Sequence, residues 1–250
     1  MPRCNPTLGE VPDEPSNCVK TAAVTFVALA RLSFLPHLHP REDIHMADIT
    51  LYWCPQTRAA RAVWMLEELG VDYSRVLINI REDEAKADPD FRAASPMGKV
   101  PALRHGDVAI TDSTAICTYL ADAFPEAGLA PAIGHPDRAK YIQWMIFSGT
   151  YIEPGMAEGF GSVKTNRLAH GWGDWPSVLD MLEQGVTDTQ WLLGDTFSAA
   201  DVMVGSSANF VRVFGLLKEG DRPAIHAYID RCLARPAFQR AMQLDAEHAL

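Results

Sequence analysis

The chain has 250 residues, of which 48% are hydrophobic and 22% are charged, so it carries enough apolar residues to build a folded core. Its formal net charge of -10 argues against nucleic acid or an anionic membrane surface as a partner. The cysteine count is odd and no CxxC pair occurs, so we expect neither a metal site nor disulfides, and a reducing cytosol fits best.

The N-terminal segment, residues 1–45, differs from the rest of the chain. It begins with a proline-rich stretch, and the apolar run at 21–35 is shorter than the about 20 residues that a membrane-spanning helix needs. Acidic residues precede this run where a signal peptide would carry basic ones. We expect residues 1–45 to be an extension that is disordered, or the product of a start codon placed upstream of a natural start at Met46.

A β-α-β unit is predicted next. Residues 49–53 form a short β-rich run, and residues 58–69 place apolar side chains on one face of a helix. Gly70 marks the end of that helix, and residues 73–80 read as a second strand. Strands joined by a crossover helix are parallel, so we expect these two strands to pair in parallel.

The next elements complete a small α/β unit. A polar stretch at 88–91 predicts a short helix, and two short strands are expected on either side of a hairpin turn at 105–107. A helix should then run to Phe124, where a proline follows. Residues 128–136 have the composition of a linker, and no strand pattern appears after them.

The remaining chain is predicted to be helical. Ser198 and Asp201 have the spacing of a capping box, which predicts a helix start at this point. The expected helical segments are 137–160, 178–186, 199–214, 223–233 and 236–242. The sequence therefore predicts an α/β domain at 46–127 followed by an all-α domain at 135–250.

Four segments, in this order, resemble the cytosolic glutathione S-transferase family. They are SPMGKVPAL at 95–103, the Asp112-Ser113 pair, TFSAAD at 196–201 and RPAF at 235–238. The resemblance, which is to the Ser/Thr-type, theta-like and bacterial members, implies a thioredoxin-like glutathione-binding domain and a helical domain with the second-substrate site. It also implies a cytoplasmic, homodimeric transferase that uses glutathione as co-substrate against a small electrophilic, hydrophobic molecule in detoxification.

The resemblance implies how glutathione is bound. The family has a cis bond before the residue that corresponds to Pro101, which turns the backbone N–H and C=O of Val100 outward to pair with a peptide ligand. Ser113, at the N-terminus of a helix, suits the γ-glutamyl carboxylate, and Asp112 suits the ammonium. Lys99 is placed to reach the glycyl carboxylate.

The chemical task is to make a thiolate. A free thiol has a pKa of about 8.5, and lowering it by two units needs about 2.7 kcal/mol of preferential stabilisation. A helix N-terminus and one hydroxyl donor together supply that amount. Counting back from Gly70, Thr57 falls where the serine-using classes carry their catalytic serine. Arg58 adds positive potential near the sulfur or is merely solvated, and Tyr52 is expected in the core.

Cys54 is the alternative catalytic residue. The Cys-Pro-x-x segment at 54–57 resembles thioredoxin-like reductases and omega-class transferases, whose cysteine forms a mixed disulfide with glutathione. That mechanism would make the protein a thiol transferase or reductase. A third possibility is a non-catalytic binding protein on the same fold, because fold does not imply function. We expect some of four residues to lie in the core and others to face the second-substrate cleft: Trp144, Phe147, Tyr151 and Met156. Trp172 and Trp175 either cover the site or merely pack.

Overall fold

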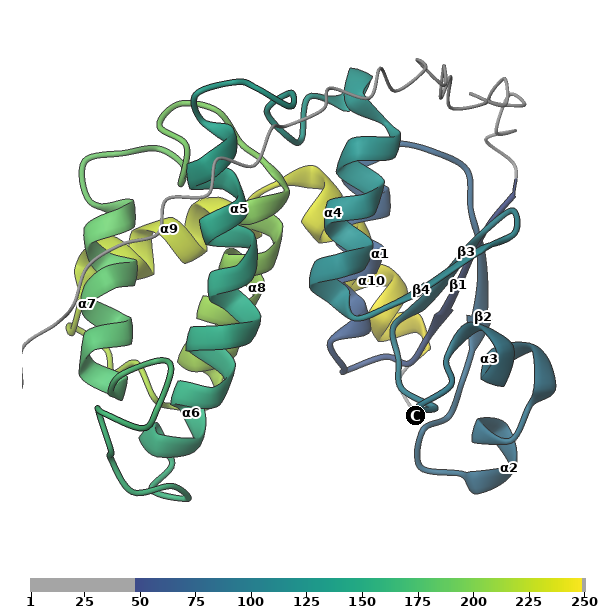
Figure 1. Cartoon of the computed structure of the whole chain (residues 1–250), viewed down its shortest axis with the longest axis horizontal. Coiled ribbons are helices and arrows are strands. Elements are labelled where there is room, and N and C mark those ends of the chain that lie inside the picture. The colour runs from purple at the N-terminus through teal and green to yellow at the C-terminus, as the bar shows by residue number, and fades with distance from the viewer. Residues whose placement is uncertain (1–47, 249–250) are drawn as a thin grey trace, which may run out of the picture. The chain divides into compact units, whose positions relative to one another are not determined.

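A four-stranded mixed sheet forms the first part of the described structure (Figure 1). The computed structural model describes residues 48–248, so the expected N-terminal extension lies outside the described residues. The strands are β1 (Ile49–Trp53), β2 (Ser74–Leu77), β3 (Ala102–His105) and β4 (Val108–Thr111), and their order in the sheet is β2-β1-β3-β4.

Helix α1 (Ala59–Leu69) connects β1 to β2, and the two strands are parallel, as predicted. Gly70 ends α1 in the left-handed conformation, with φ of 67°, a conformation in which glycine meets no steric penalty. Strand β2 is shorter than predicted, because the side chain of Asn79 accepts a hydrogen bond from the Arg81 N–H and turns the chain. The predicted hairpin joins β3 and β4.

Two short helices and one long helix complete this part. Helices α2 (Asp83–Lys86) and α3 (Pro89–Ala94) lie between β2 and β3, and α2 was not predicted. Helix α4 (Ser113–Ala123) follows β4, and a 3-10 turn (Pro125–Ala127) leads into the linker.

Strand β1 sorts its side chains between two cores. Ile49, Leu51 and Trp53 face the main core, which continues through α1 and α4 into the helical part. Tyr52 points to the opposite face, where it packs with Phe91 of α3 at 5.8 Å between ring centroids. Tyr52 therefore lies in the core, as expected from its position on the strand.

The predicted long helix at 137–160 is one helical run with an irregular turn. It consists of α5 (Arg138–Phe147), a π-helical turn (Ser148–Ile152) and α6 (Glu153–Gly159). Pro154 has no N–H to donate and its ring would clash with the carbonyl four residues earlier, so a regular α-helix cannot pass through this point. The Glu153 N–H instead bonds the Ser148 carbonyl five residues back, which defines the π turn.

Four more helices build the rest of the all-α part. They are α7 (Trp175–Val186), α8 (Ala199–Val213), α9 (Pro223–Leu233) and α10 (Pro236–Glu247). Helix α8 is central and packs against α1, α4, α5 and α9. Helix α10, longer than predicted, packs along α1 of the sheet-containing part. The expected fold class, an α/β unit followed by an all-α unit, is confirmed (Figure 1). Within residues 48–248, no helix combines the length and apolarity that crossing a membrane requires.

The predicted capping box at the start of α8 is present. Asp201 is fully buried, and its Oδ2 accepts a hydrogen bond from the Ser198 N–H at 2.9 Å. Its Oδ1 accepts from the Leu192 N–H at 2.9 Å and from the Tyr228 hydroxyl at 3.1 Å. Burial raises the pKa of Asp201 to about 6, although these hydrogen bonds oppose the rise. The carboxylate thus joins the α8 start to a loop and to α9.

Candidate active site

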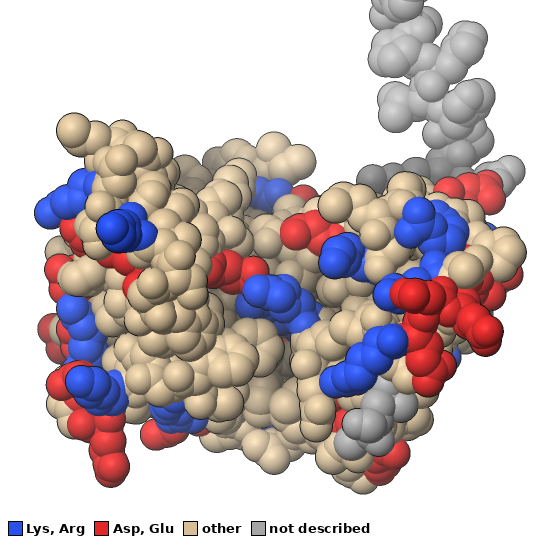
Figure 2. Space-filling view, turned by 90° about the horizontal axis from the view of Figure 1, so that it is seen from below, with Lys and Arg blue, Asp and Glu red and all other residues tan. Residues whose placement is uncertain are grey.

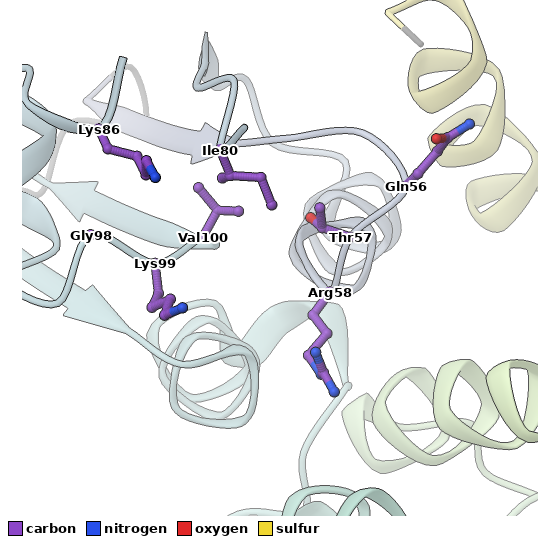
Figure 3. Close-up of a pocket in the computed structure, with 8 residues that line it drawn as sticks. All are labelled: Gln56, Thr57, Arg58, Ile80, Lys86, Gly98, Lys99 and Val100. Atoms are coloured by element: carbon purple, nitrogen blue, oxygen red, sulfur yellow. The ribbon is translucent and has the colours of Figure 1, made fainter. Parts of the chain in front are cut away.

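Two adjoining cavities lie where the N-terminus of α1 meets the segment before β3. They measure about 350 and about 390 Å³ and share three residues, Arg58, Lys99 and Val100. The first cavity is also lined by Gln56, Thr57, Ile80, Lys86 and Gly98 (Figure 3). The second is also lined by Ser95, Met97, Pro101, Thr111, Asp112 and Ser113. The structure therefore brings together the predicted site residues other than Cys54.

The Val100–Pro101 peptide bond is cis, as the resemblance implied. Among the described residues, neither the N–H nor the C=O of Val100 takes part in a hydrogen bond. Ser95 holds the preceding residue, since its hydroxyl donates to the Lys99 carbonyl and accepts from the Lys99 N–H. One free donor and one free acceptor thus stand on the wall that the two cavities share, where an extended peptide can pair with them.

Asp112 and Ser113 form the end of the second cavity. Asp112 has φ of 73°, an uncommon conformation for a residue with a side chain, and it caps α4. Its Oδ1 accepts from the backbone N–H groups of Thr114 and Ala115, at 2.8 and 3.2 Å. The Ser113 side chain is the next group along, at the first position of α4, where helix N–H groups favour an anion.

Two lysines line the groove. Lys99 is exposed and lines both cavities, and Lys86, which was not predicted as a site residue, lines the first cavity. Lys86 is already paired with Asp83 at 2.6 Å on the same short helix. In Figure 3 both lysine side chains lie on the side of the cavity away from Thr57.

Thr57 lies at the start of α1, on the wall of the first cavity (Figure 3). Its hydroxyl donates a hydrogen bond to the Cys54 carbonyl at 2.6 Å and accepts one from the Ala59 N–H at 3.1 Å. The hydroxyl is therefore a local cap of the helix in this structure. To donate to a thiolate it must exchange the Cys54 carbonyl for the sulfur.

Cys54 is fully buried and lines neither cavity. A nucleophilic cysteine of the reductase type needs access to its disulfide partner. This placement favours Thr57 over Cys54 as the residue that acts on a bound thiol.

An ion-pair cluster missed by sequence reasoning borders the second cavity. Arg58 Nε donates to Glu153 Oε2 at 2.8 Å, and Arg61 Nη1 donates to Glu153 Oε1 at 2.6 Å. Arg61 is buried, and the same Nη1 lies 3.2 Å from the Ser113 hydroxyl, while Nη2 donates to Ser207. One signal was available: Glu153 is the only charged residue between Lys140 and Glu158.

The electrostatics of this cluster follow from its partners. Burial raises the pKa of Glu153, but Arg61 and Arg58 outweigh it and hold the pKa below the usual range. Burial lowers the pKa of the Arg61 guanidinium, and Glu153 opposes that change. The cluster is thus two cations balanced by one carboxylate. On the face shown in Figure 2, positive and negative side chains are interspersed around a hollow and no large area of one sign appears.

The loop before α1 is held by the C-terminal helix. The Gln56 N–H donates to both carboxylate oxygens of Asp245 in α10, at 3.0 Å each. Gln56 has φ of 58°, and its side chain points away from the cavity toward α10 (Figure 3). Burial raises the pKa of Asp245, against the effect of this hydrogen bond. A contact 189 residues apart in the chain thus fixes the loop that carries Thr57.

The aromatic residues considered for the second-substrate cleft lie outside both cavities. Trp144 and Phe147 are buried in the main core, and Tyr151 is partly exposed and stacks on Phe147. Trp175 packs over α6, where a side chain added at Gly155 would meet its ring at 3.0 Å. Trp172 donates to Glu158. Neither cavity is lined by these aromatic residues or by the half-buried Met156.

Chemically, the groove is suited to a short anionic peptide. A helix N-terminus with a serine lies in the second cavity, the free backbone groups of Val100 and the Lys99 side chain line both cavities, and Lys86 lies in the first cavity. The N-terminus of α1, with a threonine and an arginine, faces the middle of the groove.

Comparison with known proteins agrees with this geometry. The family models "Glutathione S-transferase, N-terminal domain" and "Glutathione S-transferase, C-terminal domain" match residues 53–123 and 165–231. A glutathione S-transferase of Hyoscyamus muticus is 27% identical over 202 residues, which are 73% of this chain and 92% of that protein. The structure of a glutathione transferase from Methylococcus capsulatus superposes with a TM-score of 0.65 at 28% identity, over 80% of this chain and 99% of the other. A sphingomonad glutathione S-transferase complexed with glutathione gives a TM-score of 0.66 at 26% identity, over 79% and 98%.

Proposed function

The chain belongs to the glutathione S-transferase family, and we propose that it activates the thiol of glutathione as a thiolate and transfers it to a small electrophilic molecule. The observation that carries this proposal is the groove itself. Two cavities share the unpaired Val100 backbone and Lys99, and together they run from the N-terminus of α4 to Lys86. In the proposed division of work, residues 46–127 bind glutathione and residues 135–250 supply the second-substrate site.

The proposed pose places each charged group of glutathione against a complementary group. The γ-glutamyl carboxylate takes the Ser113 hydroxyl and the α4 N-terminus, with Asp112 near the ammonium. The cysteinyl backbone pairs with the N–H and C=O of Val100. The glycyl carboxylate takes Lys99, with Lys86 supplying further positive charge. Each contact is a charge-assisted or backbone hydrogen bond of the kind that orients a short peptide.

The thiol then lies at the N-terminus of α1. The helix end favours a negative sulfur, and the Thr57 hydroxyl adds a hydrogen bond worth about 1.5–3 kcal/mol when its acceptor is charged. The cost is the Thr57 bond to the Cys54 carbonyl, worth about 1 kcal/mol between neutral groups. The exchange is favourable once the sulfur is ionised, so the hydroxyl turns to the ligand.

The Cys54-dependent thiol transferase is the second candidate function, and the burial of Cys54 speaks against it. Replacing Cys54 by serine separates the two: conjugation survives the change, whereas disulfide exchange requires the sulfur. The non-catalytic alternative predicts glutathione binding without a thiolate, or no binding at all.

We also propose a cytoplasmic homodimer. Ile142 and Ile146 lie one turn apart on α5 and are 43% and 46% exposed, so two large apolar side chains face the same side of this helix. They are the residues we assign to the contact between subunits. Light scattering should give twice the chain mass, and Ile146→Glu should shift the protein toward monomer, whereas a monomeric native protein would refute the assignment.

Calorimetric titration with glutathione tests the proposed function. We expect binding to the native protein and about tenfold weaker binding to Ser113→Ala, the effect of one lost hydrogen bond to a charged group. Ser95→Ala is not a suitable control because Ser95 also lines the groove; Ser162→Ala, in the loop after α6, is suitable. Equal affinities in native protein and Ser113→Ala, or no binding at millimolar glutathione, would contradict the proposal.

A further inference from the structure

Glu153 occupies a position that the helix break creates. It is the first residue of α6, directly after the π turn and directly before Pro154. A π turn adds one residue to a helical turn, so every later side chain is displaced around the helix axis. This places a lone carboxylate of the helical part opposite α1 of the sheet-containing part, where it pairs with Arg58 and Arg61.

The two oxygens of Glu153 are divided between two arginines with different surroundings. The Arg58 side chain is 60% exposed, and among the described residues its Nε–Glu153 bond is its only hydrogen bond. Arg58 lines both cavities, and among the described residues its two terminal nitrogens make no hydrogen bond that would compete with a ligand. Without Glu153, a long exposed side chain of this kind samples many rotamers in solvent. The positive guanidinium then spends less of its time near the groove.

The second arginine acts on Ser113. Arg61 Nη1 is shared between Glu153 and the Ser113 hydroxyl oxygen, and arginine can only donate hydrogen bonds. Ser113 therefore accepts from Arg61, which leaves its own O–H to donate into the cavity. A ligand at this end must offer an acceptor, such as a carboxylate. Arg61 thus determines that the Ser113 hydroxyl donates its hydrogen bond toward the cavity, and Glu153 holds Arg61 in place.

We propose that Glu153 is a positioning residue that holds Arg58 over the thiol end of the groove and, through Arg61, aims the Ser113 hydroxyl at the γ-glutamyl carboxylate. The proposal rests on the proposed function, because the ligand it serves is glutathione. Glu153 itself need not touch the ligand; it sets the places of two groups that do.

Charge and position predict opposite effects, which makes the proposal testable. If Glu153 acted only through its negative charge, removing the charge would strengthen the binding of an anionic ligand and stabilise a thiolate. If it acts by position, removing the carboxylate frees the Arg58 side chain and takes from Arg61 Nη1 its charged acceptor, so binding weakens and the thiol ionises less readily. Glu153→Asp separates the two further, since it keeps the charge but is one methylene too short to reach both arginines.

The experiment compares the native protein with Glu153→Gln and Glu153→Asp. Glu68→Asp is the matched control, because Glu68 also makes two bonds to an arginine, Arg235, at 2.6 and 2.7 Å, but lines neither cavity. The readouts are KM for glutathione, kcat as a function of pH, and the thiol pKa of bound glutathione from the ultraviolet absorbance of the thiolate. Melting temperatures are measured on all four proteins.

For both Glu153 variants we expect KM for glutathione to rise about tenfold, as for the loss of one charge-assisted hydrogen bond, and the thiol pKa to rise by about half a unit or more. The loss in kcat should recover at higher pH, where the thiolate forms without help. Glu68→Asp should lower the melting temperature and leave KM and the thiol pKa unchanged.

Three results would each overturn the proposal separately from the proposed function. Native KM and thiol pKa in Glu153→Asp would show that charge alone matters, and tighter binding in Glu153→Gln would show the same. A lower melting temperature with unchanged KM and thiol pKa would leave Glu153 a purely structural residue. Failure of the proposed function looks different, because the native protein itself would then show no thiolate, and the positioning role would fall with it.

Discussion

Asp201 and Glu153 are both acidic residues in the first turn of a helix, and both accept more than one hydrogen bond. They differ in the kind of group that donates to them. The partners of Asp201 are neutral: two backbone N–H groups, Ser198 and Tyr228. Those of Glu153 are two arginines, Arg61 of α1 and Arg58 at the N-cap of the same helix. At Asp201 the effect of burial is larger than that of the hydrogen bonds, so the pKa rises. At Glu153 the effect of the two cations is larger than that of burial, so the pKa falls.

The difference shows how a fold-stabilising carboxylate can be told from one that organises a site. Asp201 accepts hydrogen bonds from neighbouring neutral groups, has no exposed surface and lines neither cavity. Glu153 keeps 21% of its side chain exposed and binds two cations, one of which lines both cavities. Neutral partners and full burial indicate a structural role, and charged partners beside a cavity indicate a functional one.

The largest expected effect is on the stability of Asp201→Ala. The change removes the α8 cap and leaves the buried N–H of Leu192 and the Tyr228 hydroxyl without their acceptor. We expect the free energy of unfolding to fall by about 3 to 5 kcal/mol, measured by urea denaturation. Protein that remains folded should keep the native KM for glutathione. A raised KM would show that Asp201 also affects the glutathione site.

The second effect is the contribution of Asp201 to the dependence of stability on pH. Its pKa rises from 3.8 in the unfolded chain to about 6 in the folded protein, so between these values the folded state holds a proton that the unfolded state has lost. This contribution to stability is complete below the unfolded pKa and is lost as the pH rises through about 6. From about pH 7 to about pH 4.5 it amounts to about 2 kcal/mol.

Asp201→Asn isolates that contribution. Denaturation midpoints at the two pH values should differ less in the variant than in the native protein, even though the amide is a poorer cap at both. An unchanged pH dependence in Asp201→Asn would mean that other groups cause it.

The smallest effect is expected at Cys54. Its thiol is buried and lines neither cavity, so Cys54→Ser should leave glutathione conjugation within about twofold of the native rate, as expected of a residue that does not touch the ligand. The assay is conjugation of a general electrophile at saturating glutathione. A loss of activity of more than tenfold without loss of fold would instead support the thiol transferase.

The elements that sequence patterns could predict are those determined locally. Strand β1, α9 and the capping box at Ser198 follow from β-rich composition, proline at a helix start and side-chain spacing, and the structure has each at the predicted place. The groove residues followed from the resemblance. The π turn was missed because Pro154 was read as part of one long helix.

The ion-pair cluster could not be predicted because its partners are far apart in the chain. Glu153 and Arg61 are separated by 92 residues, and the local sequence around either residue does not predict that the other is its partner. Periodicity does not place Arg61 toward the ligand side either, because it lies on a helix that is buried over most of its surface. The direction of the Thr57 hydroxyl is equally a property of the folded loop and of the Cys54 carbonyl it meets.

The proposed stabilisation of the thiolate depends most directly on what the Thr57 hydroxyl does when glutathione is bound. The deciding measurement is the thiol pKa of bound glutathione, from the ultraviolet absorbance of the thiolate, in the native protein, Thr57→Val and Thr57→Ser. Valine keeps the shape of threonine and removes the hydroxyl, and serine keeps the hydroxyl. We expect a pKa about two units below the free value of about 8.5 in the native protein and Thr57→Ser, and at least about one unit higher in Thr57→Val. The same pKa in all three proteins would show that the hydroxyl stays with the Cys54 carbonyl as a helix cap, and would contradict the account.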